Sequence, residues 1–213
     1  ASSREGSPRS HTSNSNKLDP EPPEDRMPIF YTKFISRVYG HNSYVPVRDG
    51  VPTQAACQLA LVIGQECRRV KEDEAYEYIA GVCVCCDFAV PDWVTNESRW
   101  LIGSAYDAPL LIGPALMQWS KIEDFEGIKM RLSVNGKLAV EGRVCDMKDQ
   151  PGKLLAHISK FVTLNPGDIV CCGAPVGLPD VEEPSLMPGD VVVCTADEIG
   201  EVSCTIVEDT LID

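Results

Sequence analysis

Thr163-Leu-Asn-Pro-Gly-Asp-Ile-Val-Cys-Cys-Gly-Ala-Pro-Val-Gly177, followed by a second Pro-Gly-Asp at 188–190, is the stretch that decides the expected fold. Proline fixes φ at the first turn position and glycine supplies the positive φ that follows, so each triplet reverses the chain. Each turn leads into a β-branched run, Ile169-Val170 in the first case and 191–193 in the second. The stretch therefore predicts two consecutive turn–strand units.

The remainder of the chain also reads mainly as strands. Ala55–Ile63 is a nearly continuous apolar run, which is typical of a strand buried on both faces. Asn135-Gly136 favours a type I′ turn between two alternating segments. Further strands are expected at 29–35, 44–47, 80–87, 128–134 and 137–140, and helices at 71–79 and 154–161. The pattern indicates an α+β, mainly β domain.

Composition restricts the classes of function. The chain has 213 residues and a net charge of −13, which argues against an extended surface for nucleic acid. No apolar run approaches the roughly 20 residues that a membrane-spanning helix needs. We therefore expect no direct nucleic-acid partner and no membrane span.

The chain has ten cysteines, eight of which lie inside apolar stretches, and they are not arranged as a disulfide framework. Cys83-x-Cys85-Cys86 is rich in sulfur but lacks the second ligand pair of a zinc site. In a strand, Cys83 and Cys85 share one face while Cys86 points to the other. We expect buried, reduced thiols and a reducing compartment inside the cell.

Residues 1–26 differ from the rest of the chain. This region is rich in Ser, Pro and acidic residues and shows no periodicity, so we expect an extended, disordered-like N-terminal tail before a folded domain at 27–213. It contains no signal-peptide pattern. The start in small and hydroxylated residues without methionine suggests that a targeting segment has been removed, as in a mitochondrial protein.

The motifs together resemble the fumarylacetoacetate hydrolase family. Its C-terminal pattern is T-L-x-P-G-D-x-I-x-T-G-T-P-x-G followed by x-L-x-P-G-D, which Thr163–Gly177 and Pro188–Asp190 match, and its frame L-A-x-V-I-G is present at Leu59–Gly64. The resemblance covers about residues 27–208. It implies a mixed, rolled β-sandwich with a few short helices around one pocket.

The resemblance also locates the family's Mg²⁺ or Mn²⁺ site. The family takes two glutamates from x-E-x-E-L-A-x-V-I-G, but Ala56 and Gln58 stand at those positions. Asp87 matches the third ligand and is the only one retained. Because hard divalent ions need several charged oxygen ligands, we expect no metal and no cofactor, with weak Mg²⁺ or Mn²⁺ binding as the alternative.

The family's other chemical positions are replaced as well. Its catalytic lysine corresponds to Ser104, and the N-terminal His-x-x-Glu dyad has no counterpart around His11. The remaining positions, an asparagine, an arginine and a threonine in the family, are Cys86, Pro91 and Ala174. The resemblance thus predicts no catalytic residues here.

These losses favour a catalytically silent member of the family. The leading hypothesis is a structural accessory subunit of a large mitochondrial assembly, bound through the tail and the domain surface on the matrix side. The matrix arm of NADH:ubiquinone oxidoreductase is the first choice of host and the mitochondrial ribosome the second. The alternative is an enzyme that hydrolyses, decarboxylates or tautomerises acylpyruvate-like keto acids, its metal held by Asp87, Gln58 and water with Asp92 or Glu97 nearby. A third possibility is a vestigial pocket that binds a small organic acid.

Overall fold

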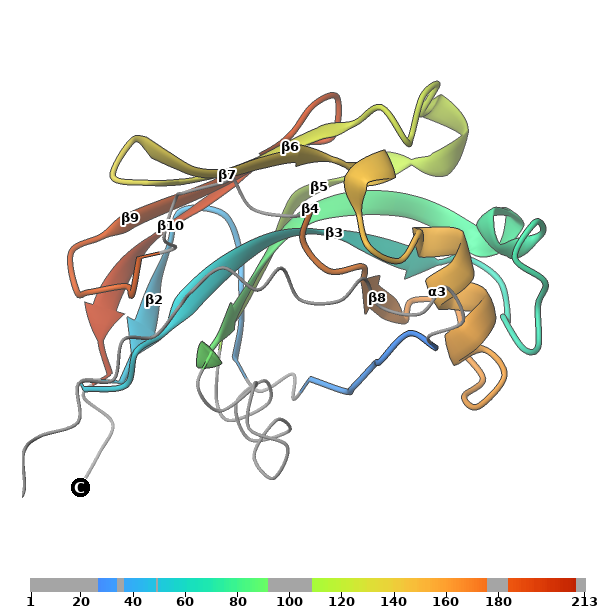
Figure 1. Cartoon of the computed structure of the whole chain (residues 1–213), viewed down its shortest axis with the longest axis horizontal. Coiled ribbons are helices and arrows are strands. Elements are labelled where there is room, and N and C mark those ends of the chain that lie inside the picture. The colour runs from blue at the N-terminus through green and yellow to red at the C-terminus, as the bar shows by residue number, and fades with distance from the viewer. Residues whose placement is uncertain (1–26, 34–36, 49, 92–108, 176–183, 210–213) are drawn as a thin grey trace, which may run out of the picture.

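Two five-stranded sheets pack face to face and enclose the hydrophobic core (Figure 1). The computed structural model describes residues 27–33, 37–48, 50–91, 109–175 and 184–209. The first sheet has the order β1 (Val38–Tyr39), β5 (Leu110–Gln118), β4 (Ile79–Ala89), β3 (Gln54–Ile63) and β8 (Ile169–Cys171). The second has the order β2 (Ser43–Val47), β10 (Gly200–Glu208), β9 (Val191–Ala196), β6 (Lys129–Val134) and β7 (Lys137–Arg143). The predicted mainly β sandwich is confirmed.

Both sheets are mixed. β1 pairs with β5, and β2 with β10, in parallel, whereas the other pairings are antiparallel. The centre of the first sheet is the long β3–β4 pair. Side chains on its inner face, among them Leu59, Val84 and Phe88, are buried against the second sheet. The apolar run of Ala55–Ile63 thus forms the expected central strand.

The turn chemistry agrees with the sequence analysis. Asn135 and Gly136 have φ of 52° and 75°, as a type I′ turn between β6 and β7 requires. Gly167 and Gly189 have φ of 94° and 97° in the two Pro-Gly-Asp turns, and β8 and β9 follow these turns.

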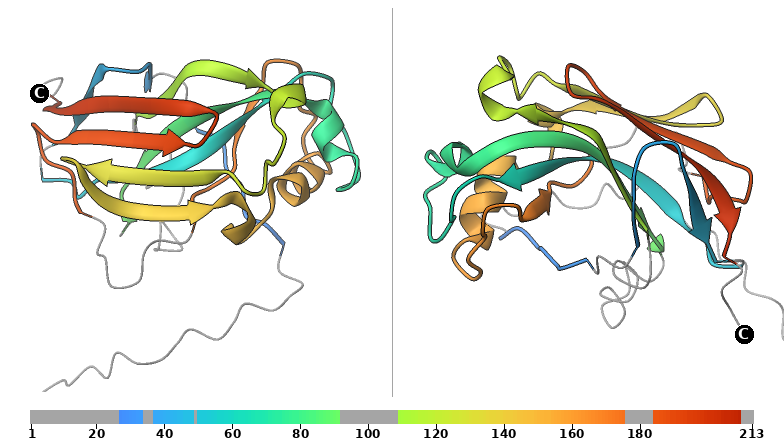
Figure 2. Two further views of the ribbon diagram at one scale, coloured as in Figure 1. Left: turned by 90° about the horizontal axis from the view of Figure 1, so that it is seen from above. Right: turned by 180° about the vertical axis from the view of Figure 1, so that it is seen from behind.

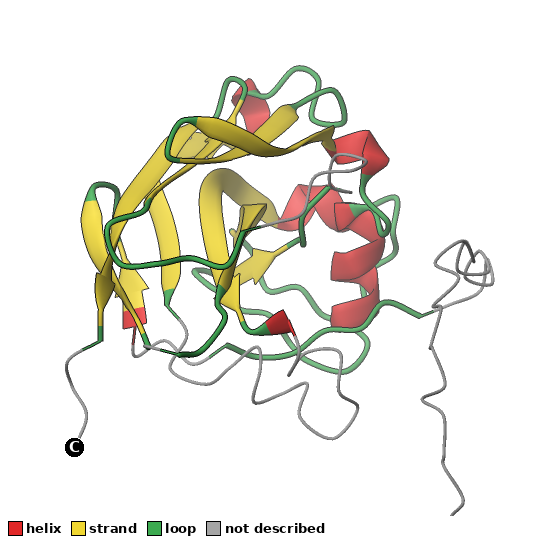
Figure 3. Cartoon of the chain, turned by 60° about the vertical axis from the view of Figure 1, so that its left-hand side comes forward, coloured by secondary structure: helices red, strands yellow, loops and turns green. Residues whose placement is uncertain are grey.

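Most of the helical segments gather toward one end of the sandwich (Figure 3). The helix α3 (Pro151–Ile158) begins and ends about three residues before the predicted 154–161, because Pro151 already occupies a favourable first position. The predicted helix at 71–79 is only the 3-10 turn η2 (Ala75–Tyr78). Tertiary contacts explain the shortening, since Tyr76 stacks on Trp119 at 5.0 Å and its hydroxyl accepts a hydrogen bond from the backbone N–H of Gly152. Two further 3-10 turns are η3 (Trp119–Lys121) and η4 (Val144–Asp146).

The segment 27–33 lies across the outer face of the first sheet, the side turned away from the second sheet (Figures 1 and 2). The prediction of a strand at 29–35 is wrong for residues 29–33, which join neither sheet; residues 34–36 lie outside the described part of the chain. The side chains of Tyr31 and Lys33 contact Asp87, and Lys33 also contacts the carbonyl oxygen of Phe88, both on β4. Within the described residues, the helices are all too short to cross a membrane.

All ten cysteines are free. Cys83 and Cys85 lie on the outer face of the first sheet and Cys86 lies in the core between the sheets, as predicted. The predicted domain boundary after residue 26 stays a prediction, because residues 1–26 lie outside the described part.

Candidate functional site

The candidate site is built on the outer face of β3 and β4. In their antiparallel register Ala56 lies opposite Asp87, and Gln58 lies opposite Cys85. Directly opposed residues point to the same side of a sheet, and so do residues i and i+2 of one strand. The three positions that the family resemblance assigns to metal ligands (56, 58 and 87) are therefore brought together.

Asp87 is the only charged residue of these three positions and is 7% exposed. Its Oδ1 forms an ion pair with Nζ of Lys33, whose ammonium also donates a hydrogen bond to the carbonyl oxygen of Phe88 at 3.0 Å. The hydroxyl of Tyr31 donates to Oδ2 of Asp87 at 3.3 Å. The side chains of Lys33 and Asp87 are 14% and 9% exposed. Removing one partner of such a buried pair typically costs about 3–5 kcal/mol, because the remaining charge is left uncompensated.

Gln58 is also buried, and its amide is directed to the backbone of the loop after β8. Its Oε1 accepts a hydrogen bond from the N–H of Gly173 at 3.0 Å. Gly173 has φ of 85°, a conformation that suits glycine and lets this N–H face the strand. The neighbouring Ala174 is exposed.

Thiols form a neutral wall beside these polar groups. Sγ of Cys85 and Sγ of Cys171 lie 3.7 Å apart, with Cys83 and Ala60 in the same small cluster. The hydrogen bond with Cys171, together with burial, raises the pKa of Cys85 well above 9.0, and burial raises the pKa of Cys83. Both thiols therefore stay protonated and uncharged at neutral pH.

The other predicted positions are less informative. Cys86 points away from the site into the core. Pro91 is half-buried just after β4. Ser104, Asp92 and Glu97 lie outside the described residues.

The described residues do not fit a hard divalent cation. The methyl group of Ala56 cannot coordinate, the Gln58 oxygen is uncharged and already bonded, and Asp87 is paired with an ammonium. Within the described ranges there is also no cluster of three His, Cys, Asp or Glu side chains suited to a metal ion. Mg²⁺ and similar ions require more oxygen ligands than this.

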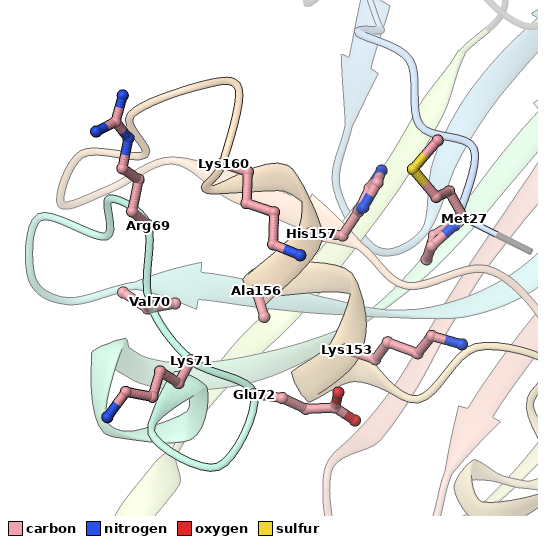
Figure 4. Close-up of a pocket in the computed structure, with 10 residues that line it drawn as sticks. Met27, Arg69, Val70, Lys71, Glu72, Lys153, Ala156, His157 and Lys160 are labelled. Atoms are coloured by element: carbon pink, nitrogen blue, oxygen red, sulfur yellow. The ribbon is translucent and has the colours of Figure 1, made fainter. Parts of the chain in front are cut away.

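A separate cavity of about 630 Å³ lies beside α3 (Figure 4). Its walls carry Arg69, Lys71, Lys153 and Lys160 together with Glu72. Lys71 is paired with Glu74 at 2.9 Å, Lys153 with Asp149 at 3.5 Å, and the side chains in Figure 4 diverge rather than converge on one point. The positions assigned by resemblance do not line this cavity, so we place the site on the β3–β4 face.

Tyr31 and Lys33 were not among the site residues predicted from the sequence. Both residues lie in the segment 29–35 that was predicted as a strand, and both side chains point toward Asp87. A buried carboxylate needs a positive charge beside it. With the two glutamates replaced by Ala56 and Gln58, the retained Asp87 was the signal in the sequence that such a partner exists. It could not have indicated which lysine.

Comparison with known proteins identifies the family. The family model described as fumarylacetoacetate (FAA) hydrolase C-terminal matches residues 5–207, and the chain belongs to this family. It is 34% identical over 197 residues to oxaloacetate tautomerase fahd2, mitochondrial, from Xenopus laevis, covering 89% of this chain and 61% of the relative. It is 31% identical over 185 residues to human oxaloacetate tautomerase FAHD2B, mitochondrial, covering 84% and 59%. The chain thus spans about six-tenths of the length of these curated relatives.

Solved structures agree in fold. 5-carboxymethyl-2-hydroxymuconate delta-isomerase from Mycobacterium smegmatis superposes with a TM-score of 0.77 at 25% identity, covering 86% of this chain and 71% of that chain. Maleylpyruvate hydrolase from Sphingobium sp. SYK-6, in complex with manganese (II) ion and pyruvate, superposes with a TM-score of 0.71 at 25% identity, covering 82% and 62%.

These relatives overturn the main functional prediction. A catalytically silent accessory subunit of a respiratory complex or ribosome is wrong, because the relatives are named as tautomerases, isomerases and hydrolases. That prediction rested on the loss of the family's chemical positions alone, the two metal carboxylates among them. The expectation of no cofactor is likewise unsupported, since one solved relative holds manganese. The mitochondrial names of the relatives agree with the predicted mitochondrial setting.

Proposed function

We propose that this chain is an enzyme that interconverts the enol and keto forms of a small 2-oxo acid, with oxaloacetate as the first candidate, in mitochondria. The observation that carries the proposal is the hydrogen bond between Tyr31 and the buried Asp87 on the β3–β4 face. The names of the relatives support the substrate class, and the pyruvate held by the maleylpyruvate hydrolase supports a 2-oxo acid in this fold.

Tautomerisation suits the groups present better than hydrolysis does. It moves one proton between oxygen and carbon and needs no activated water. His41 accepts a hydrogen bond from the N–H of Ser203 in the second sheet, and His157 packs against Phe30 and Phe161. Neither of these two histidines contacts Asp87 in the part of the chain that the structure describes, so neither is placed there as an imidazole base for water.

The proton balance can be written with two side chains. The Asp87 carboxylate takes the proton of the enol hydroxyl while the Tyr31 phenol gives a proton to C3. Asp87 then returns its proton to the tyrosine oxygen along their 3.3 Å hydrogen bond. One O–H bond is broken and one C–H bond is formed, so no atom is gained or lost. The N–H of Gly173 fixes the orientation of Gln58 beside the reacting groups.

The test is the rate at which enol-oxaloacetate loses its ultraviolet absorbance. We expect Asp87→Asn and Tyr31→Phe each to lower the enzymatic rate by roughly 10²-fold or more, the usual contribution of a general acid or base. Tyr44→Phe is the matched control, because Tyr44 is 70% exposed on β2 in the other sheet. If the wild type does not accelerate the reaction over buffer, or instead cleaves acylpyruvates to pyruvate, the proposal is wrong.

A further inference from the structure

Lys33 places a positive charge at the carboxylate to which the family resemblance assigns a divalent cation. The segment 27–33 crosses the outer face of the first sheet, and the ammonium of Lys33 reaches both Oδ1 of Asp87 and the carbonyl oxygen of Phe88. The pair is largely enclosed, with side chains 14% and 9% exposed. A cation is therefore built into the site as a side chain.

The facing strand is consistent with such a replacement. Ala56, directly opposite Asp87, contributes a methyl group, and Gln58 contributes a neutral amide. One carboxylate charge is thus balanced by one ammonium charge. A divalent ion at Asp87 would have to displace Lys33 or lie beside it, and like charges at such short distances repel strongly where water is excluded.

We propose that the Lys33 ammonium is the resident cation of this site, replacing a divalent metal ion and holding the carboxylate and 2-oxo oxygens of the substrate. The ammonium offers directional N–H donors and a full charge, which suit anionic oxygens. The identity of the ligand rests on the proposed function, whereas the replacement of the metal ion by Lys33 is independent of that function.

The first experiment titrates Mn²⁺ into the full chain and follows the loss of the free-ion signal by electron paramagnetic resonance. We expect no saturable binding by the wild type. A triple variant combines Lys33→Met, Ala56→Glu and Gln58→Glu, so that two new carboxylates join Asp87 and the ammonium is removed. We expect this variant to bind Mn²⁺ and its melting temperature to rise when Mn²⁺ is added. Ala56→Glu, Gln58→Glu with Lys33 retained should bind the ion more weakly than the triple variant.

The second experiment measures pyruvate binding by calorimetry in the presence of EDTA. We expect binding by the wild type to persist under chelation and to weaken by about tenfold or more in Lys33→Met, as for the loss of a charged hydrogen bond. Arg37→Met is the matched control, because Arg37 forms another well-covered ion pair, with Asp209 at 2.7 Å. It should bind pyruvate like the wild type. If Lys33→Met does not fold, the double variant Lys33→Met/Asp87→Asn, which removes both charges of the pair, replaces it in the pyruvate titration.

The outcomes separate this inference from the proposed function. Saturable Mn²⁺ binding by the wild type that is lost in Asp87→Asn overturns the inference, as does pyruvate binding that EDTA abolishes. Failure of the triple variant to gain Mn²⁺ binding also overturns it. If the wild type binds no pyruvate under any condition, the ligand half of the inference and the proposed function both fail, and the metal titration alone decides whether Lys33 has replaced the ion.

Discussion

Cys145 is exposed, Cys171 is half-buried, and the other eight cysteines are buried. Accessibility and thiolate fraction together set the rate at which a thiol reacts. Burial raises the pKa of Cys67, Cys83 and Cys172, so these thiols are both shielded and protonated at neutral pH. Slight desolvation and the neighbouring Asp146 also raise the pKa of Cys145, but solvent reaches its sulfur.

We therefore predict that an aromatic disulfide reagent at pH 8 modifies one of the ten thiols rapidly in the native protein. Cys145→Ser should abolish the rapid phase, and urea should make every remaining thiol reactive. The measurement is the absorbance of the released thiolate with time. Because Cys171 is half-buried, a second and slower equivalent is allowed, whereas three or more rapid equivalents in the native protein would contradict the burial of the core thiols.

At the scale of single elements, the close approach of two strands explains why a glycine occupies position 81. Gly81 lies at the start of β4 beside a register shift in the pairing with β5. A Cβ at this position would be 2.3 Å from the carbonyl oxygen of Met117 and 2.9 Å from Cγ of Leu116. No rotamer can relieve a contact with the backbone, so the strands would have to move apart.

We predict that Gly81→Ala lowers the free energy of unfolding by about 1–3 kcal/mol, the usual cost of overpacking. Gly40→Ala is the matched control, because a Cβ there meets no atom within 4 Å and Gly40 has no positive φ. Its effect should stay within about 0.5 kcal/mol. Urea unfolding followed by tryptophan fluorescence measures both. Equal stability of the two variants would show that β4 and β5 separate without cost.

The same scale shows what could be predicted from sequence. The apolar run at Ala55–Ile63 and the Asn135-Gly136 turn depend on local chemistry, so β3 and the β6–β7 hairpin were found close to their true bounds. The segment at 29–33 has strand-like alternation, but its conformation depends on a distant carboxylate at Asp87. Tertiary contacts of this kind leave no periodic signal in the sequence.

For the whole molecule, the family frame identified the fold and the positions 56, 58 and 87, yet the inferred function was wrong. The metal ligands were compared position by position, while the partner of Asp87 is Lys33, which lies far away in sequence. The net charge of −13 gave no guidance about the groups around Asp87, since net charge describes solubility and not the chemistry of a buried ion pair. Which groups meet in space at Asp87 therefore could not be predicted from that comparison.

The enclosed thiols also affect the stability of the whole molecule. Burial raises the pKa of Cys172 far above its ordinary value of 9.0. Below pH 9 the folded and unfolded states both hold this proton, and the stabilisation is complete. Above pH 9 the unfolded state releases the proton while the folded state keeps it, so the free energy of unfolding falls as the pH rises further.

We predict that this thiol adds a slope of about −1.4 kcal/mol per pH unit to the stability curve above pH 9. Cys172→Ala should remove this contribution to the pH dependence of the free energy of unfolding. The measurement is urea unfolding in steps from pH 8 to about 11, which begins below the pKa of the thiol in the unfolded state. Val170→Ala, buried at the β8 edge of the same core, is the control, because it loses volume but no titrating group. It should lower stability equally at every pH. If both variants keep the wild-type slope, the Cys172 thiol ionises as readily in the folded state as in the unfolded chain, and solvent must reach this part of the core.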